Sequence, residues 1–249
     1  MKSKRALALG LLSGILAACG QPGTSSGGAS ADGPGATSGT MSTATLGGVT
    51  MYTTTTTGPP QHPTSSATGE RDGLVVDYVL VNNGTSPVLV HDRVPSDLGS
   101  ATLPADLNPE HAWAFMSDGR IRLSKQGFAP APGVRFIAAP VIGARVLEPK
   151  QRLTGRAWAP VPLRLDVPSP EFDAPRAPLS PKATTWSFCV QVTVGGSQGA
   201  AGTAPSDASV LAVPAAAPND GELLCSEPWP LPPAASPGAA NPSGTPAPN

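Results

Sequence analysis

The sequence predicts an all-β fold, a β-sandwich, from three observations. Short runs of β-branched and aromatic residues recur between turn signals from about residue 70 to residue 230. Prolines recur every few residues from Pro87 to Pro181, and an interior proline breaks a helix. Apolar and polar residues alternate along 185–194, the period of a strand with one buried face. Seven to eight such strands are typical of a sandwich.

The first nineteen residues have the layout of an export signal. Basic residues at 2–5 precede a mostly apolar run at 6–18, which is too short to span a bilayer. The run ends in Leu-Ala-Ala-Cys at 16–19, which resembles the lipobox of bacterial lipoproteins. The resemblance implies removal of the signal peptide 1–18 and diacylation of Cys19, so the chain would be held to a membrane by lipid. The alternative is an ordinary signal peptide that carries a cysteine by chance.

Residues 19–69 are expected to form the lipidated cysteine and a disordered linker. Of positions 20–69, 41 are Gly, Ser, Thr, Pro or Ala, and Asp32 is the only charged residue. We find no apolar periodicity there with which to build a core. The folded domain is therefore expected at 70–230.

The first strands of this domain are expected on either side of Asn83-Gly84, a strong short-turn pair. Residues 74–81 form a β-rich run, and 88–92 is its expected partner strand. The sequence 81–88 resembles the strand-turn-strand opening of bacterial immunoglobulin-like extracytoplasmic domains. This resemblance covers about twenty residues, favours an immunoglobulin-like sandwich and implies no function.

A hairpin is expected next, with strands at 112–117 and 120–125 joined by Asp118-Gly119. Its two-residue turn places Met116 near Ile121. Further strands are expected at 134–138, 144–147 and 151–158. The only helical segment expected is a single turn at Asn108-Pro109-Glu110.

The last clear strand, 185–194, carries Cys189, which is expected to pair with Cys225. These are the two cysteines that remain once Cys19 takes lipid, and an exported chain would close that bond. The bond should staple the returning segment 215–229 over the outside of the sheet, with Cα atoms about 4.4–6.8 Å apart. Residues 195–220 should form a long loop with a short strand at 210–213. Residues 231–249, with six prolines and no charge, should form a disordered tail.

Composition and motifs narrow the function. Without residues 1–18 the chain has 13 Lys and Arg against 17 Asp and Glu, which disfavours nucleic-acid binding. No P-loop, dinucleotide or calcium-loop motif occurs, and the three histidines lack zinc-site spacing, so no metal or cofactor is expected. His91-Asp92 is a His–acid neighbour pair at the end of an expected strand. Neighbours on a strand point to opposite faces, so His91 is expected to be a partly exposed strand-end residue without a catalytic role.

Charges are segregated along the chain. Residues 118–164 hold nine basic and two acidic residues, whereas 70–117 hold seven acidic and two basic ones. Neutralisation across paired strands is the favoured interpretation, and a basic surface patch is the alternative. The hairpin register places Arg122 opposite Phe115, which would set aromatic rings beside cations suited to an anionic ligand. The candidate patch consists of Trp113, Phe115, Arg120, Arg122 and Lys125.

These observations predict a non-enzymatic lipoprotein whose sandwich is an interaction or structural module of the cell envelope. Its expected partners are the membrane, through the lipid on Cys19, and an envelope protein or an anionic polysaccharide. Gly20 differs from the Asp of an inner-membrane retention signal, which favours the outer membrane where the host has one. The alternative is a small extracytoplasmic hydrolase or a carbohydrate-active, anionic-polymer-binding domain.

Overall fold

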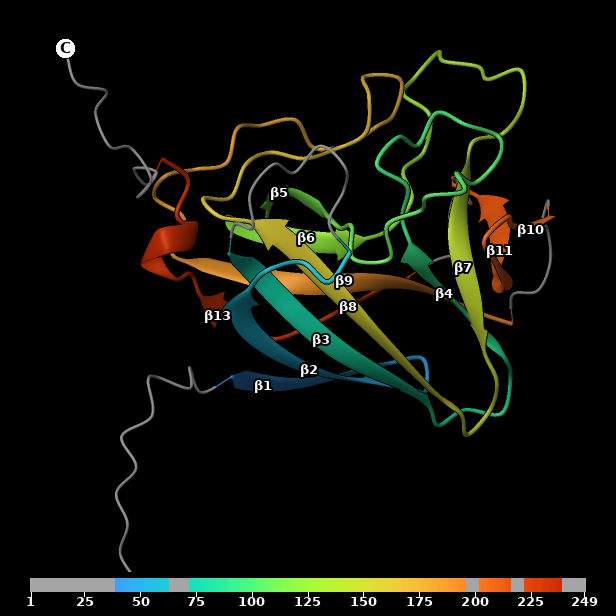
Figure 1. Ribbon diagram of the computed structural model, residues 1–249, viewed down its shortest axis with the longest axis horizontal. Helices are drawn as coiled ribbons and strands as arrows, with labels where there is room; N and C mark the ends of the chain where they lie inside the picture. The colour runs from blue at the N-terminus through green and yellow to red at the C-terminus, as the bar shows by residue number, and fades with distance from the viewer. Residues whose placement is uncertain (1–38, 63–71, 196–201, 216–221, 239–249) are drawn as a thin grey trace, which may run out of the picture. The chain divides into compact units, whose positions relative to one another are not determined.

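Two β-sheets pack face to face in the described part of the protein (Figure 1). The computed structural model describes residues 39–62, 72–195, 202–215 and 222–238, which all fall in one compact unit beginning at Thr37. The predicted all-β sandwich is confirmed. It has thirteen strands among these residues, more than the seven to eight expected.

Sheet A has four antiparallel strands in the order β1-β2-β3-β8. Their bounds are Thr40–Leu46 (β1), Val49–Gly58 (β2), Gly73–Asn82 (β3) and Arg152–Pro160 (β8).

Sheet B is larger and is built around β9, Thr185–Val194. Strands β4 and β6 follow one another along one side of β9, β6 being parallel to it, while β12 and β13 pair with its other side. The path of paired strands through the sheet is β10-β11-β7-β4-β9-β6-β5, with β12 and β13 off this path. The remaining bounds are Val88–Arg93 (β4), Trp113–Ser117 (β5), Arg120–Lys125 (β6), Val141–Leu147 (β7), Gly202–Ala204 (β10), Asp207–Pro214 (β11), Glu222–Cys225 (β12) and Trp229–Pro230 (β13).

Part of the strand pairing matches the immunoglobulin-like pattern. In that fold strand B pairs with E in one sheet, while C, F and G are neighbours in the other. Here β3 pairs with β8, and β9 lies between β4 and β12. The expectation that 88–92 pairs with 74–81 is therefore wrong. The chain crosses between the sheets after Asn82, so β4 pairs with β7 and β9 instead.

The main core lies between the two sheets. The alternation predicted for 185–194 is present over most of β9, because Trp186, Phe188, Val190 and Val192 all belong to this core. Val194, at the end of the same row, is 54% exposed instead. Opposite them lie inward side chains of sheet A. These include Val49, Met51, Leu74, Val76, Tyr78, Leu80 and Leu153.

A second core covers the outer face of sheet B. Its side chains come from β4, β5, β7 and β11 and from the long loops after β4, after β6 and before β9, which lie at the top of Figure 1. Its buried members include Leu89, Val94, Leu98, Trp113, Phe115, Phe128, Ile142 and Phe172. The strand expected at 134–138 is absent, since this segment belongs to one of these loops. Phe136 stacks there on Phe172, with ring centroids 5.2 Å apart.

The predicted linker was wrong for residues 40–58, which form β1 and β2. Gly47-Gly48 joins them as a tight turn, and both glycines have positive φ angles, 55° and 83°. The inward side chains Val49 and Met51 are fully buried, so these threonine-rich strands do have an apolar face. The domain thus begins near Thr40 and not at residue 70.

The predicted disordered tail was also wrong in its first part. Residues 233–235 form a short 3-10 helix, Ala235 is fully buried, and its carbonyl accepts a hydrogen bond from the Leu163 amide at 3.1 Å. Residues 1–38 and 239–249 lie outside the described residues. The predicted signal peptide, Cys19, the start of the predicted linker and the end of the predicted tail all fall there.

The Cys189–Cys225 disulfide is closed, as predicted. The two cysteines face each other in register on β9 and β12, and their Cα atoms are 4.1 Å apart, slightly below the expected range. The staple over the outside of the sheet was wrong. Strand β12 lies within sheet B beside β9. Directly opposed residues of antiparallel strands are close enough to bridge, so the disulfide joins two neighbouring strands of one sheet.

Candidate functional site

A bulge in β4 turns the Asp92 side chain into the sandwich. The register of β4 against β7 shifts between Val90 and Arg93, which lies opposite Gly143. A Cβ at Gly143 would lie 2.5 Å from the Arg93 Cβ, so the close approach requires glycine. Bulges of this kind redirect side chains. The fully buried Asp92 carboxylate is the result.

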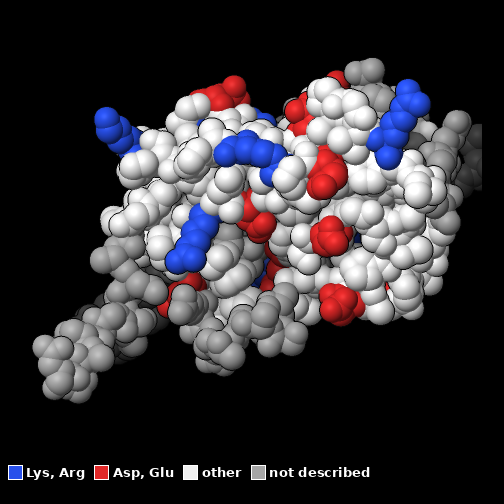
Figure 2. Space-filling model, turned by 90° about the horizontal axis from the view of Figure 1, so that it is seen from above, with Lys and Arg blue, Asp and Glu red and all other residues white. Residues whose placement is uncertain are grey.

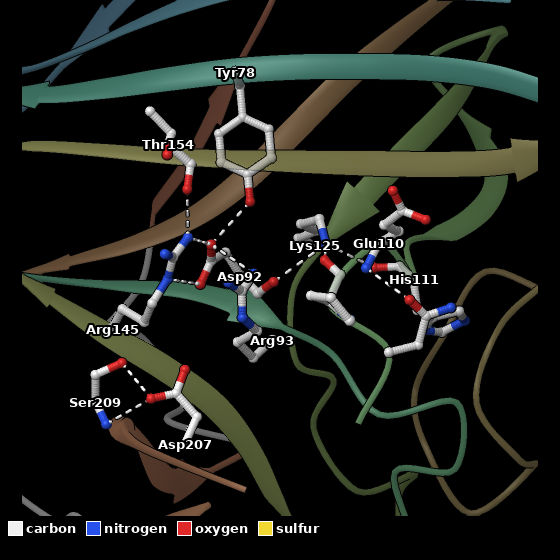
Figure 3. A network of polar contacts seen from close by, with 12 residues as sticks. Tyr78, Asp92, Arg93, Glu110, His111, Lys125, Arg145, Thr154, Asp207 and Ser209 are labelled. Atoms are coloured by element: carbon white, nitrogen blue, oxygen red, sulfur yellow. Dashed lines mark hydrogen bonds and ion pairs between the residues drawn. The ribbon is translucent and has the colours of Figure 1, made fainter. Parts of the chain in front are cut away.

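Asp92 joins the two sheets (Figure 3). The Tyr78 hydroxyl of sheet A donates to Asp92 Oδ2 at 2.9 Å. The Arg145 guanidinium of β7 donates to both carboxylate oxygens and, from NH2, to the Thr154 carbonyl of sheet A at 2.8 Å. Tyr78 reaches across because its strand partner is Gly155, where a Cβ would lie 2.2 Å from the tyrosine hydroxyl.

The charges in this group support one another. Burial by itself would raise the pKa of Asp92, but hydrogen bonds and charge from Arg145, with Arg93 and Lys125, hold the pKa below its ordinary value. Burial and the neighbouring Asp92 carboxylate raise the pKa of Tyr78 well above its ordinary value. At neutral pH Asp92 is therefore an anion that accepts from a neutral phenol and a guanidinium.

Lys125 fixes the loop that precedes β5. Its ammonium group is fully buried and donates to three backbone carbonyls, those of Pro109 at 2.7 Å, His111 at 3.0 Å and Asp92 at 3.2 Å. Burial lowers the pKa of Lys125 to about 7, against the opposing effect of the Asp92 charge. Residues 109–111 are thereby held against β4.

Glu110 lies on this fixed loop. Its side chain is 2% exposed, and Oε2 accepts from the amides of Gln61 at 2.8 Å and His62 at 3.0 Å. Its own carbonyl accepts from the Trp158 amide at 2.9 Å. The helical turn expected at 108–110 is wrong: these residues form a non-helical turn, in which Asn108 Oδ1 accepts from the Glu110 amide at 2.9 Å.

Two adjoining hollows open beside Glu110. The smaller has a volume of about 360 Å³, and the larger about 640 Å³. They share a wall formed by His62, Arg93 and Pro109, so we treat them as one polar cleft. Other residues of the smaller hollow include Gln61, Asp77, Glu110, Thr154 and Arg156. Other residues of the larger hollow include Asp106, Asn108, Ser206 and Asp207.

The predicted anionic-ligand patch is wrong, although the hairpin that carries it is right. Strands β5 and β6 pair in the predicted register, with Phe115 opposite Arg122 and Trp113 opposite Ser124. Trp113 and Phe115 are 0% and 2% exposed because the second core covers that face. Lys125 is buried as well.

The arginines of the hairpin do not form a basic surface either. Arg122 pairs with Asp118 at 3.0 Å, and Arg120 precedes it on the same strand. On the face drawn in Figure 2, Lys and Arg stand apart from one another with Asp and Glu between them.

The favoured interpretation of the segregated charges holds for two pairs of residues. Asp77 on β3 lies directly opposite Arg156 on β8, and the pair is bidentate at 2.7 and 3.0 Å. Asp92 and Arg145 form the second such pair, between β4 and β7. Acidic and basic segments of the chain thus neutralise each other across paired strands.

His91 is buried and not partly exposed as expected. Its side chain bonds through Nε2 to Thr193 Oγ1 at 3.0 Å, while Nδ1 has no partner among the described residues. Burial lowers its pKa to about 4, and the nearby Asp92 charge opposes that shift. His91 and Asp92 are not joined by a hydrogen bond in the described structure, which matches the expectation for neighbours on a strand.

The sequence did not point to the cleft. Its polar groups come from segments far apart in the chain, those around 61–62, 77, 93, 110 and 156, and no motif connects them. The charge pattern predicted acidic strands paired beside basic ones, and among the residues of the cleft only the Asp77–Arg156 pair follows from that prediction.

Comparison with protein-family models, curated proteins and solved structures finds no match to this chain. In the described ranges no three His, Cys, Asp or Glu side chains lie close enough to share a metal ion. Nor does any helix in those ranges have the length and hydrophobicity to cross a membrane.

Proposed function

We propose that the protein is a lipid-anchored, non-enzymatic binding module of the cell envelope, at the outer membrane where the host has one. The observation that carries the proposal is the Leu-Ala-Ala-Cys sequence at 16–19, which ends a short way before a disulfide-closed sandwich. A structural disulfide is typical of an oxidising, extracytoplasmic compartment. The two features therefore agree on export.

The ionisable groups around the cleft support a binding role over a catalytic one. The Asp92 carboxylate accepts hydrogen bonds from Tyr78 and Arg145, and the Lys125 ammonium group donates its hydrogen bonds to three backbone carbonyls. These groups hold the cleft in shape, as a preformed binding surface requires.

Radiolabelled palmitate tests the proposal. The full chain is expressed in a bacterium that processes lipoproteins. The wild type should take up label and fractionate with membranes, whereas Cys19→Ala should take up none and accumulate as the uncleaved precursor. Cys225→Ser, which removes a different cysteine, should label like the wild type. Absence of label from the wild type, together with normal processing of Cys19→Ala, would show that the lipoprotein assignment is wrong.

A further inference from the structure

Strand β1 is the outermost strand of sheet A, and its outer side is unpaired (Figure 1). The Asn83 amide donates to the Gly48 carbonyl at 2.8 Å, so the even-numbered residues of β2 bond to β3 and the odd-numbered ones to β1. By the β1–β2 register, the N–H and C=O groups of Met41, Thr43 and Thr45 therefore point away from the sheet. In the described part of the chain these groups have no hydrogen-bond partner.

The other edge strands in the described ranges are covered or very short. On β5, Ala114 exchanges two backbone hydrogen bonds with Asp166 of a later loop, each 2.8 Å long. On β8, the Trp158 amide donates outward to the Glu110 carbonyl at 2.9 Å, and the strand ends in Pro160. Strands β10, β12 and β13 have only three, four and two residues. Coverage, proline and shortness all discourage the addition of another strand.

Strand β1 carries none of these protections. Its sequence, Thr-Met-Ser-Thr-Ala-Thr-Leu at 40–46, contains no charged residue and no proline. It pairs with β2 without a register shift, so it has no bulge. On its inner side Ser42 Oγ accepts from the Glu227 amide at 3.1 Å, which fixes the strand to the sandwich. It is thus a fixed, uncharged and open template for another strand.

Large apolar side chains lie beside this edge on the outer face of sheet A. Met41 is 74% exposed and Tyr52 is 44% exposed. Tyr52 lies directly opposite Thr43, and Met41 is two residues from Thr43 on the same face of β1. The side chains of an added strand would cover part of both, and the removal of apolar surface from water favours that addition.

The outward groups of β1 are complementary to those of a second copy of the same strand. When two copies run antiparallel about a two-fold axis at Thr43, this residue lies opposite the partner's Thr43, and Met41 lies opposite the partner's Thr45. Each of the three residue pairs then exchanges two hydrogen bonds. Self-pairing brings no like charges together because the strand is uncharged, and a Thr–Thr pair across strands is favourable.

We propose that two copies of the chain associate through antiparallel β1 strands. The two four-stranded sheets then form one continuous sheet, with the closed two-fold symmetry that is most common among homo-oligomers. A single strand of seven residues gives an interface below the standard size, so the dimer forms in a concentration-dependent way. This association goes beyond the proposed function and does not depend on lipid at Cys19.

Disulfide trapping with the full chain, in the envelope of the expressing bacterium, tests the register. After mild oxidation, Thr43→Cys should give a covalent dimer on a non-reducing gel, because the Cα atoms of such opposed residues are about 5.5 Å apart. Met41→Cys and Thr45→Cys, each alone, should cross-link at least about tenfold less, because each lies roughly 13 Å along the strand from its own copy. Ile137→Cys, fully exposed on the loop after β6, measures random collision. The unaltered chain measures any cross-link through Cys19.

A charge placed at the two-fold axis tests the contact itself. The double variant Met41→Cys/Thr45→Cys should cross-link, since each thiol lies opposite the other position of the partner. Adding Thr43→Lys sets two like charges opposite each other and should lower the cross-linked fraction at least about tenfold. Adding Thr56→Lys, an exposed position on β2, should leave that fraction unchanged. Both lysine variants should keep the urea midpoint, because both threonines are exposed.

Four results would overturn the proposal. The first is a Thr43→Cys dimer no more abundant than that of Ile137→Cys, and the second is stronger cross-linking by Met41→Cys or Thr45→Cys alone. The third is a double variant whose cross-linking is unaffected by Thr43→Lys. The fourth is a Thr43→Cys product with the mass of a complex with another protein, since β1 would then pair with a different partner. Palmitate labelling of Cys19 is measured separately, so failure of this inference stays distinguishable from failure of the lipoprotein proposal.

Discussion

At the scale of single residues, burial decides how the charged groups behave. Asp92 and Lys125 are both fully buried, but each is surrounded by groups that satisfy it. His91 differs, because its Nδ1 has no partner among the described residues and its pKa falls to about 4. A proton on this imidazole is therefore unfavourable in the folded state.

His91 should make the fold sensitive to acid. Its pKa is about 4 when folded and 6.5 when unfolded, so between these values the unfolded chain binds the extra proton. The free energy of unfolding then falls as the pH falls, by about 2 kcal/mol between pH 7 and pH 5. Urea unfolding at both pH values measures the loss.

The comparison for this prediction is His91→Gln, whose amide does not titrate. Between pH 7 and pH 5 the variant should lose about 2 kcal/mol less of its free energy of unfolding than the wild type loses. Equal losses in the two proteins would mean that His91 is protonated as readily in the folded state as in the unfolded chain.

At the scale of elements, the hairpin β1–β2 is an integral part of the sandwich. It supplies the fully buried Val49 and Met51 to the main core, and each such side chain stabilises by about 1.5–3 kcal/mol. Strand β2 also pairs with β3 along its whole length. Without this hairpin β3 would become an unprotected edge strand.

Truncation distinguishes the two domain boundaries. A chain shortened to begin at residue 38 should unfold cooperatively, with a urea midpoint close to that of the chain from residue 19. A chain that begins at residue 70 loses β1 and β2 and should be largely unfolded or aggregated, because the lost burial is a large part of a typical stability of about 5–15 kcal/mol. Circular dichroism and urea unfolding measure both. Equal stability of the two shortened chains would restore the linker interpretation for 40–58.

The hairpins show why some elements could be predicted and others not. Asp118-Gly119 adopts two positive φ angles, 52° and 76°, so its turn chemistry determines the β5–β6 register to the residue. Gly47-Gly48 is the same kind of signal. The strands beside it are rich in threonine and therefore resemble a linker in composition, although threonine is β-branched and favours strands.

At the scale of the whole molecule, the part that could not be predicted is the second core. The alternation of 185–194 correctly placed the inward side chains of β9, because a strand has a fixed period. The loops that cover Trp113 and Phe115 have no period, and their packing depends on contacts far apart in sequence. The exposed aromatic patch was wrong for this reason, and the cleft, assembled from five distant segments, was missed for the same reason.

The Cys189–Cys225 bond joins β12 to the centre of sheet B and closes a segment of 36 residues. Loop closure of this length stabilises the fold by about 4 kcal/mol in the chain-entropy model. Cys225→Ser should therefore lower the melting temperature while leaving the circular dichroism spectrum β-rich, because both cores remain. Calorimetric melting of the wild type with and without reductant provides the comparison. An unchanged melting temperature would mean that β12 is held by its strand pairing alone.

The position of β1 determines how far the domain can stand from its proposed lipid. The first strand begins at Thr40, so about twenty residues separate Cys19 from the sandwich, and they reach at most about 70 Å in any conformation. A linker of fifty residues would have allowed about 170 Å. The domain would be confined to a hemisphere whose radius is the linker's reach. Within about 70 Å the cleft would meet ligands on its own membrane at an effective concentration on the order of millimolar, roughly tenfold above that with a fifty-residue linker. A weak binding site would be sufficient at that range, and more distant layers of the envelope would be out of reach.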